Sequence, residues 1–599
     1  MCGIAGVVGP GASALADRVR AMIAALEHRG PDEHGVTVFD DAVLGNARLS
    51  IIDPEGGHQP LLGPDGRTAL VCNGEIYGHD RLRAELRNYP FRTGSDCEVA
   101  LALYDRHGDD LLRHLPGTFA LALWDDRRHQ LLLARDRFGE RPLYYCLTDG
   151  LLAFASESRA LEAGGFDRGR PDPEMIGEML RQGYVPSGRS IWSGVSSLLH
   201  ASALTWDTRR PPVVRRWWSP PEVRSRVSAE EATEWFRREL DRAVQDQLEA
   251  DVPVGAFLSG GIDSTTIAAL AARHHPDLHA FTFDMPGESE LEHARATADL
   301  HGMTLHVLAP DVGDVAAAIE ALPGAWDEPF GDSSALPTRM LSEFARRDVT
   351  VALTGDGADE LLGGYLVWTR GLLDPGSAGS TEPSGRIEAQ GIRGRLAARR
   401  ARTAADPHRV ARRFASFRQY FDADDLRSLG LPGRDAHDVD VTAYGYGTAD
   451  DICRFDLDHY LPGDILVKTD RASMAHGLEV RAPFLDVAVA EGCLALPADL
   501  KVDATHEKLL LRRSFSSLWP ESVRNRRKQG FGSPMQSWLA LPAVQDLRSA
   551  YLRDPASPLF DLVERNAVER LSTDEDQRTW NLLVLAIWWA HARARTAAS

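Results

Sequence analysis

The sequence is poor in lysine and lacks the lysine motif of a common class of nucleotide-binding loops. Only four of its 67 basic residues are lysines, and all lie in the last quarter of the chain: Lys468, Lys501, Lys508 and Lys528. No GK[ST] triplet occurs, which disfavours a Walker-type loop for γ-phosphoryl transfer. The net charge is -20. This charge argues against a general binder of nucleic acid or anionic membranes, although a local basic pocket can still hold an anionic substrate.

Cysteine pairs and long apolar runs are also missing. The six cysteines show no CxxC or other metal-ligand spacing, so neither a zinc site nor a disulfide framework is predicted. The N-terminus has no basic segment followed by a full apolar stretch, and no run reaches the roughly eighteen apolar residues of a membrane helix. These absences predict a cytoplasmic protein with no membrane partner.

The length and the pattern of apolar runs predict two domains. At 599 residues the chain is too long for a single core. Up to about residue 205, short apolar runs such as GIAGVVG and GTFALALWD alternate with turns, which is typical of an antiparallel sandwich. Buried strands and amphipathic helices then alternate, which predicts a parallel α/β sheet. We therefore expect a first domain at 2–208, a proline-rich linker at 209–229, and a second domain at 230–599 with a variable insertion at 372–450.

The N-terminus, MCGIAGVVG, carries a candidate nucleophile. Methionine is usually removed before a small residue, so we expect the mature chain to begin at Cys2. The thiol and a free α-amine would then belong to one residue, and the amine can accept the thiol proton near neutral pH. A cysteine at this position is common by chance, so its meaning depends on the motifs that follow.

Those motifs contain the other groups that attack on a carboxamide requires. Asn73 and the Gly74 backbone N–H, on a turn after a buried strand, can donate to an oxyanion. Arg48 can grip an α-carboxylate, and Glu75 and Asp96 can receive an α-ammonium. Taken singly, these residues are better explained as a hairpin turn, a surface arginine and solvated acids.

The segments HRGPDEHG, ARLSIID, VCNGEIY, TGSDCE and RDRFGERPLYY, in this order, closely resemble the class II glutamine amidotransferase domain. The resemblance covers the first 200 residues and implies an α+β N-terminal-nucleophile fold, an αββα sandwich. It implies that Cys2 hydrolyses glutamine to glutamate and ammonia, with Asn73 and Gly74 forming the oxyanion hole. The glutamine-binding residues that it implies are Arg48, Leu49, Ile51, Asn73, Gly74, Glu75 and Asp96.

The second half contains a candidate phosphate-binding loop, VGAFLSGGIDSTTIAAL at 254–270. A strand, a glycine-rich turn and a helix place backbone N–H groups where they can cradle phosphate oxygens, and Ser259 and Ser264 add hydroxyls. A tight turn with glycines chosen for packing is the alternative. Farther on, TGDGADELLGGY supplies Asp359, which could bind Mg²⁺ together with Asp263.

These motifs, with KTDRASMAHGLEVRAPFLD, HEKLLLR and RRKQGFGSP, resemble the glutamine-hydrolysing asparagine synthetases, whose second domain is an α/β PP-loop domain with added helices. The resemblance implies that ATP activates a carboxylate as an acyl-adenylate with release of pyrophosphate, and that ammonia, carried through a shielded passage, displaces AMP. It also implies Mg²⁺, a homodimer and a catalytic Lys508. The ATP-binding residues that it implies are Leu258, Ser259, Gly260, Gly261, Asp263, Ser264, Phe283, Thr354 and Gly355.

The chain departs from this pattern at Asp356, where the best-studied members have glutamate. The shorter side chain could shift a proton-accepting role. Three functions are therefore weighed: an asparagine synthetase, the same chemistry on a specialised carboxylic acid, and a catalytically silent regulatory protein.

The acceptor pocket is the least determined part of the sequence. The segment WDEPFGDSSALPT supplies four polar residues, Asp327, Glu328, Asp332 and Ser333. These could hold the ammonium of aspartate or cap a helix that begins near Ser334. Aspartate is the default acceptor, on the resemblance alone.

Overall fold

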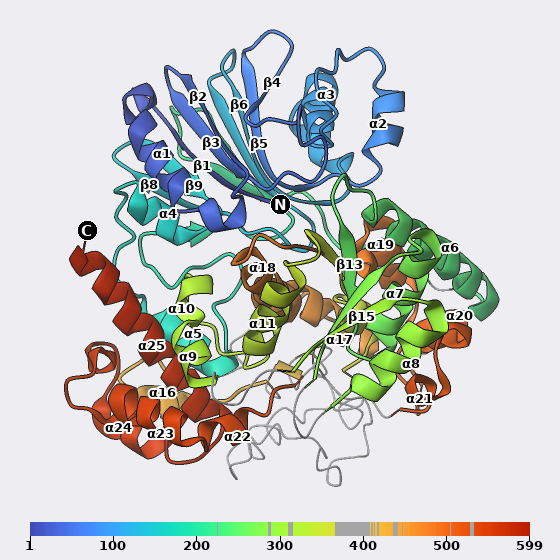
Figure 1. Cartoon of the computed structure of the whole chain (residues 1–599). Coiled ribbons are helices and arrows are strands. Elements are labelled where there is room, and N and C mark those ends of the chain that lie inside the picture. Colours follow the sequence, from blue (N-terminus) through green and yellow to red (C-terminus); the bar gives the residue numbers. More distant parts are fainter. Residues whose placement is uncertain are drawn as a thin grey trace.

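The computed structural model describes residues 1–224, 226–284, 289–309, 315–365, 408, 411, 414–415, 418–434, 441–445, 447–503, 505–526 and 532–598. Most of the predicted insertion at 372–450 lies outside these residues, as does most of the RRKQGF segment. The chain forms two halves, each built on β-sheet, and its N-terminus lies at their junction (Figure 1).

Two antiparallel sheets stack in the first half. Sheet A has the strand order β10-β8-β9-β1-β3-β2, and sheet B has the order β12-β11-β7-β6-β5-β4. The strands of sheet A are β10 (Ser196–Ser197), β8 (Tyr144–Thr148), β9 (Leu151–Ala155), β1 (Cys2–Val8), β3 (Ala42–Arg48) and β2 (Glu33–Phe39). Those of sheet B are β12 (Val213–Arg216), β11 (Ser202–Trp206), β7 (Gln130–Arg135), β6 (Thr118–Asp125), β5 (Thr68–Glu75) and β4 (Leu61–Leu62).

Residue alternation along β1 shows how the layers are held together. Ile4 and Val8 join the core between the two sheets, whereas Ala5 and Val7 join the core beneath helix α1 (Ala16–Ala24). This is the period of two expected of a strand that is buried on both faces. Helix α3 (Glu98–His107) covers the outer face of sheet B in the same way (Figure 1). The predicted αββα sandwich is confirmed.

Part of the predicted linker is strand rather than irregular chain. β12 pairs antiparallel with β11 and forms the edge of sheet B. Val213 and Val214 are β-branched and suit a strand, and the exposed Arg215 and Arg216 are the charged side chains that protect an edge.

The second half is built on a five-stranded parallel sheet of order β15-β14-β13-β16-β17. Its strands are β15 (Thr304–Leu308), β14 (His279–Phe283), β13 (Val254–Phe257), β16 (Val351–Leu353) and β17 (Glu479–Arg481). The chain proceeds from β13 outward to β14 and β15, then returns to β16 on the opposite side of β13. This reversal of strand order makes the carboxyl ends of β13 and β16 a topological switch point, where parallel sheets usually bind ligands in a crevice.

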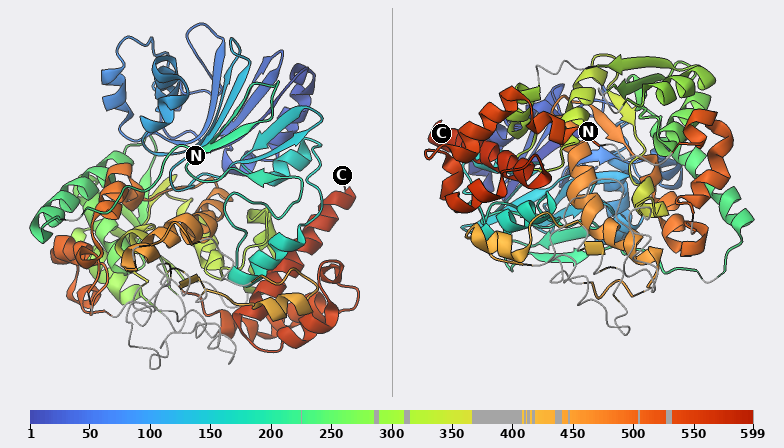
Figure 2. Two further views of the ribbon diagram at one scale, coloured as in Figure 1. Left: turned by 180° about the vertical axis from the view of Figure 1, so that it is seen from behind. Right: turned by 90° about the horizontal axis from the view of Figure 1, so that it is seen from below.

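Helices cover this sheet and extend toward the first half. The 19-residue α6 (Ala229–Gln247) begins with a capping box formed by Ser228 and Glu231. The C-terminal helix α25 (Gln577–Ala598) runs from the second half toward the first (Figures 1 and 2), and its Asn581 donates to the Leu180 carbonyl. No described helix is both long and apolar enough to cross a bilayer.

The other helices are α2 (His79–Glu85), α4 (Ser158–Ala163), α5 (Pro173–Gln182), α7 (Ile262–His274), α8 (Leu291–His301), α9 (Val315–Glu320), α10 (Leu322–Ala325), α11 (Ala335–Ala345), α12 (Ala358–Leu362), α16 (Ala423–Ser428), α17 (Ala449–Phe455), α18 (Leu466–Met474), α19 (Val487–Ala495), α20 (Leu509–Phe515), α21 (Glu521–Arg524), α22 (Met535–Leu539), α23 (Pro542–Arg548) and α24 (Arg565–Leu571).

Candidate active sites

Cys2 begins β1 at the junction of the two halves. It pairs with Arg48 on β3, and its side chain is buried beside the Leu49 backbone N–H and the Asn46 amide. Burial raises the pKa of the Cys2 thiol, and the nearby Met1 α-ammonium and the Leu49 N–H partly oppose that rise. A thiol in this setting needs a base close by to become a nucleophile.

Met1 precedes Cys2 in the structure, and its α-ammonium forms a buried ion pair with Glu479 of β17. The ammonium group next to Cys2 is therefore paired with a carboxylate from the second half. The predicted free amine on Cys2 requires removal of Met1 and stays a prediction.

Asn73 has the geometry of an oxyanion donor. Its Oδ1 accepts a hydrogen bond of 3.0 Å from the Cys2 backbone N–H, which holds the amide against the nucleophile. Its Nδ2 is buried and has no hydrogen-bond partner within the described residues. A buried donor without an acceptor costs about 1–3 kcal/mol, so the group is poised to donate to charge that develops on a substrate.

Gly74 follows Asn73 in β5 and is packed closely against β6. A Cβ at this position would lie 2.1 Å from the Thr118 carbonyl oxygen, so only glycine fits. The sequence motif VCNGEIY thus places a side-chain donor and an unobstructed backbone next to each other on one buried strand.

Glu75 and Asp96 form a buried acidic pair beside this strand. Asp96 accepts a 2.7 Å hydrogen bond from the Ile76 N–H, and Glu75 lies 3.5 Å from the Arg481 guanidinium. Burial and the neighbouring Asp96 charge raise the pKa of Glu75 well above its usual range. Two acids that repel each other favour an added cation, such as the α-ammonium of glutamine.

Arg48 is engaged with its own loop. Its guanidinium donates to three backbone carbonyls, those of Ile52 (3.0 Å), Asp53 (2.7 Å) and Pro54 (3.1 Å). Leu49 and Ile51 are buried in one cluster with Met1. Arg48, Leu49 and Ile51 therefore lie beside Cys2. Binding of an α-carboxylate by Arg48 stays a prediction.

The glycine-rich loop lies at the crevice between β13 and β16. Gly260 has φ of 74°, a left-handed conformation that favours glycine, and Gly261 is the N-cap of α7 without any side-chain cap. The Ser259 and Ser264 hydroxyls lie 3.0 Å apart across the turn. Uncapped N–H groups at the start of this 13-residue helix suit phosphate oxygens.

The remaining predicted nucleotide residues lie at the same edge of the sheet. A Cβ on Gly355 would lie 2.9 Å from the Ser264 backbone nitrogen, so the loops after β13 and β16 are in close contact. Thr354 donates from its N–H to the Arg481 carbonyl at 2.9 Å. Leu258 and Phe283 are buried at the ends of β13 and β14.

Lys508 joins the two predicted metal ligands. Its ammonium lies 2.6 Å from Asp263 and 2.7 Å from Asp359. Burial alone would lower the pKa of Lys508, but the two carboxylates raise it above its ordinary value. Two carboxylate oxygens converging on one point are also a donor set that fits Mg²⁺.

Asp356 is held by helix α18. The Thr469 hydroxyl donates to its carboxylate at 2.8 Å. Burial raises the pKa of Asp356, and the Lys468 ammonium and the Thr469 hydroxyl oppose that rise. Lys468 also donates to Asp332 at 3.0 Å. Lys468 and Thr469 belong to the motif KTDRASMAHGLEVRAPFLD, but the sequence alone indicates no role for them, because their partners lie more than a hundred residues away.

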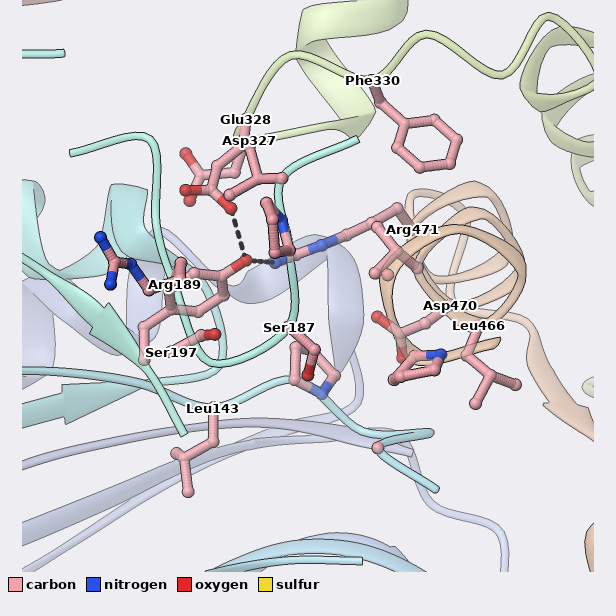
Figure 3. Close-up of a pocket in the computed structure, with 18 of the residues that line it drawn as sticks. Leu143, Ser187, Arg189, Ser197, Asp327, Glu328, Phe330, Leu466, Asp470 and Arg471 are labelled. Atoms are coloured by element: carbon pink, nitrogen blue, oxygen red, sulfur yellow. Dashed lines mark hydrogen bonds between the residues drawn. The ribbon is translucent and has the colours of Figure 1, made fainter. Parts of the chain in front are cut away.

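Asp327 and Glu328 do not cap the helix that begins after Ser334. Asp327 accepts from the Arg159 N–H at 2.8 Å, and Glu328 accepts from Ser190 at 2.7 Å and from Tyr144 at 2.9 Å. Both carboxylates join the second half to the first. Asp327 satisfies a backbone N–H in the first turn of α4, and neither residue caps α11. They border an interface cavity of about 50 Å³ that Leu466, Asp470 and Arg471 also line (Figure 3).

Asp332 and Ser333 do lie before α11. Asp332 accepts from the Ser334 N–H at 2.8 Å, and Ser333 forms a 2.5 Å hydrogen bond with Ser533. Asp332 thus satisfies a backbone donor at the helix start and also pairs with Lys468. Of the four predicted acceptor residues, only these two are compatible with a place near Asp356.

Comparison with known proteins decides the family. The model of the asparagine synthase family matches residues 235–591. The chain belongs to the asparagine synthase family. The glutamine amidotransferase domain model matches residues 1–218.

Two relatives are similar to this chain over nearly their whole length. A putative asparagine synthetase [glutamine-hydrolyzing] of Mycobacterium bovis is 35% identical over 98% of this chain and 97% of its own. Asparagine synthetase [glutamine-hydrolyzing] 1 of Bacillus subtilis is 31% identical over 98% and 96%. A solved glutamine phosphoribosylpyrophosphate amidotransferase from B. subtilis is 16% identical over 51% of this chain and 65% of its own, with a TM-score of 0.28, too weak to bear on the fold.

Proposed function

We propose that this asparagine synthase transfers the amide nitrogen of glutamine to the side-chain carboxylate of aspartate, with conversion of ATP to AMP and pyrophosphate. The observation that carries the proposal is the Lys508 ammonium between Asp263 and Asp359, directly beside the phosphate-binding turn. A cation held at this point can neutralise charge on the phosphates during attack at the α-phosphorus.

In the glutaminase half, which we assign to 2–208, the Cys2 sulfur attacks the glutamine carboxamide and forms a thioester. Asn73 Nδ2 and the Gly74 N–H donate to the oxyanion. The α-amine of Cys2, freed by removal of Met1, accepts the thiol proton and passes it to the leaving nitrogen, and ammonia departs. Water then hydrolyses the thioester to glutamate and restores the thiol.

In the synthetase half, which we assign to 230–599, an oxygen of the acceptor carboxylate attacks the α-phosphorus and pyrophosphate leaves. Asp263 and Asp359 would hold Mg²⁺, which when bound neutralises phosphate charge. Ammonia then attacks the acyl carbon, and AMP leaves with the carboxylate oxygen. Asp356 then accepts a proton from the attacking nitrogen, a role that the burial-raised pKa of its carboxyl supports. The homodimer and the cytoplasmic location stay predictions from the sequence.

The proposal is tested by ATP–pyrophosphate exchange against a panel of carboxylic acids, followed by mass analysis of the product. We expect exchange with aspartate and formation of asparagine. Exchange with a different acid only would show that the acceptor is a specialised carboxylic acid rather than aspartate. Exchange with none of the acids would exclude ligase activity. Cys2→Ala should abolish use of glutamine but retain synthesis from ammonium salts, and equal loss with both donors would contradict the division of labour.

A further inference from the structure

Helix α18 contacts the synthetase pocket through two consecutive residues. Lys468 donates to Asp332 at 3.0 Å and to Ser334 at 2.9 Å, and Thr469 donates to Asp356 at 2.8 Å. These partners lie after β16 and before α11, at the edge of the sheet where, in the proposed function, the acceptor acid meets the α-phosphate. The start of α18 is therefore fixed by groups whose charge and contacts change when that pocket is filled.

The next residue of α18 contacts the glutaminase nucleophile through one intermediary. Asp470 accepts two hydrogen bonds of 2.9 Å from Arg29, a bidentate pair in which both side chains are buried. Arg29 Nε donates to the Cys2 backbone carbonyl at 3.2 Å. Cys2 is thus anchored on one side by Asn73 and on the other by an arginine that the second half holds.

Glu157 contacts both Arg29 and Arg471, the residue of α18 that follows Asp470. Arg471 forms a 2.5 Å ion pair with Glu157, and Arg29 also donates to Glu157 at 3.2 Å. Removing one member of a buried charged network leaves the other members uncompensated, so the arrangement tolerates few intermediate positions. A small displacement of α18 would consequently be passed to Arg29 rather than absorbed.

We propose that α18 couples the two active sites and that Asp470 is a positioning residue for Cys2. Filling of the synthetase pocket changes the contacts of Lys468 and Thr469, and the rigid helix transmits the change through the Asp470–Arg29 pair to the Cys2 backbone. Glutamine is then hydrolysed fastest when an acyl-adenylate is ready for the ammonia. This inference rests on the proposed function, because it requires that both half-reactions occur.

The test compares Asp470→Asn with a matched control, Asp458→Asn, in the full chain. Asp458 also joins the two halves, through Arg216 at 2.7 Å and His200 at 3.2 Å, but has no contact with Arg29 or Cys2. For each variant, glutaminase turnover is measured with and without ATP and aspartate, together with the ratio of glutamate to AMP formed. Synthesis from ammonium salts reports on the integrity of the synthetase half.

We expect Asp470→Asn to lose the stimulation of glutaminase turnover by ATP and aspartate, within the roughly 5- to 150-fold range of typical site–site coupling, and to form excess glutamate per AMP. Asp470→Glu should restore part of the stimulation, and Asp458→Asn should retain it. Wild-type stimulation and ratio in Asp470→Asn would overturn the inference. If Asp470→Asn does not fold, Arg29→Lys, which keeps the buried positive charge, is judged by the same criterion. Absence of AMP from the unmodified enzyme would instead refute the proposed function.

Discussion

The Lys508 ammonium and the Asp263 carboxylate lie 2.6 Å apart, although 245 positions separate them in the chain. Asp263 stands in the first turn of α7, and Lys508 immediately precedes α20 with φ of 53°, a left-handed conformation that is unusual for lysine. Such a backbone is retained where surrounding structure enforces it, often at functional sites. Both the position and the conformation of Lys508 serve the pairing with the phosphate-binding turn.

Replacement of Lys508 should therefore stop adenylation whichever nitrogen donor is supplied. We expect Lys508→Gln to lower pyrophosphate release about 10²- to 10³-fold, the range seen when one stabilising donor is removed from an active site. Lys501→Gln is the control, since Lys501 is equally buried but pairs with Asp450 outside the crevice. Near-normal pyrophosphate release by Lys508→Gln would show that adenylation does not require this lysine.

Asn73 should matter only for glutamine. The Nδ2 group has no acceptor in the described structure, so we expect it to be used on the tetrahedral intermediate. Asn73→Ala should lower glutaminase turnover by about 10²- to 10³-fold while synthesis from ammonium salts continues. Steady-state assays with the two donors distinguish this from a general loss of folding, which would reduce both rates together.

Both catalytic motifs could be predicted because their chemistry is local in sequence. Cys2, Asn73 with Gly74, and the SGGIDS turn each bring reactive groups together within a few residues. The antiparallel-sandwich and parallel-sheet patterns follow from apolar periodicity, and the αββα arrangement from the family resemblance. The contacts of Arg29, Lys468 and Thr469 depend on tertiary packing between segments hundreds of residues apart, which periodicity does not encode. The interdomain partners of Asp327 and Glu328 could not be predicted for the same reason: an acidic residue in a loop has no sequence signal for its partner.

The interface role of Glu328 gives a prediction for the acceptor. Since its carboxylate is occupied by Ser190, Ile191 and Tyr144, it should not bind the acid that is amidated. We expect Glu328→Gln to change the KM for aspartate less than about twofold, a difference of under ~0.5 kcal/mol. A large rise in the KM for aspartate, with an unchanged KM for ATP, would show that Glu328 contributes to binding of the acceptor.

The pH dependence of stability should reveal the buried Asp464. Burial and the neighbouring Asp332 raise the pKa of Asp464 to about 8, far above that of an unfolded aspartate. The folded state therefore holds a proton that the unfolded state has lost, so stability from this group falls as pH rises from about 4 to about 8.

Asp464→Asn removes this titration. We expect the variant to differ little from the unmodified protein in stability at pH 4, and to be more stable at pH 8 by an amount on the order of 5 kcal/mol. Thermal unfolding at the two pH values is the measurement. An equal Tm difference at both pH values would show that Asp464 does not titrate in this interval.

The central claim, that nitrogen from glutamine reaches a carboxylate activated as its adenylate, is tested most directly by a doubly labelled turnover. The enzyme is supplied with ATP, glutamine carrying ¹⁵N in its amide, and aspartate carrying ¹⁸O in its side-chain carboxylate. We predict asparagine that contains ¹⁵N and AMP that has gained one ¹⁸O atom. ADP in place of AMP, or AMP without ¹⁸O, would contradict the account.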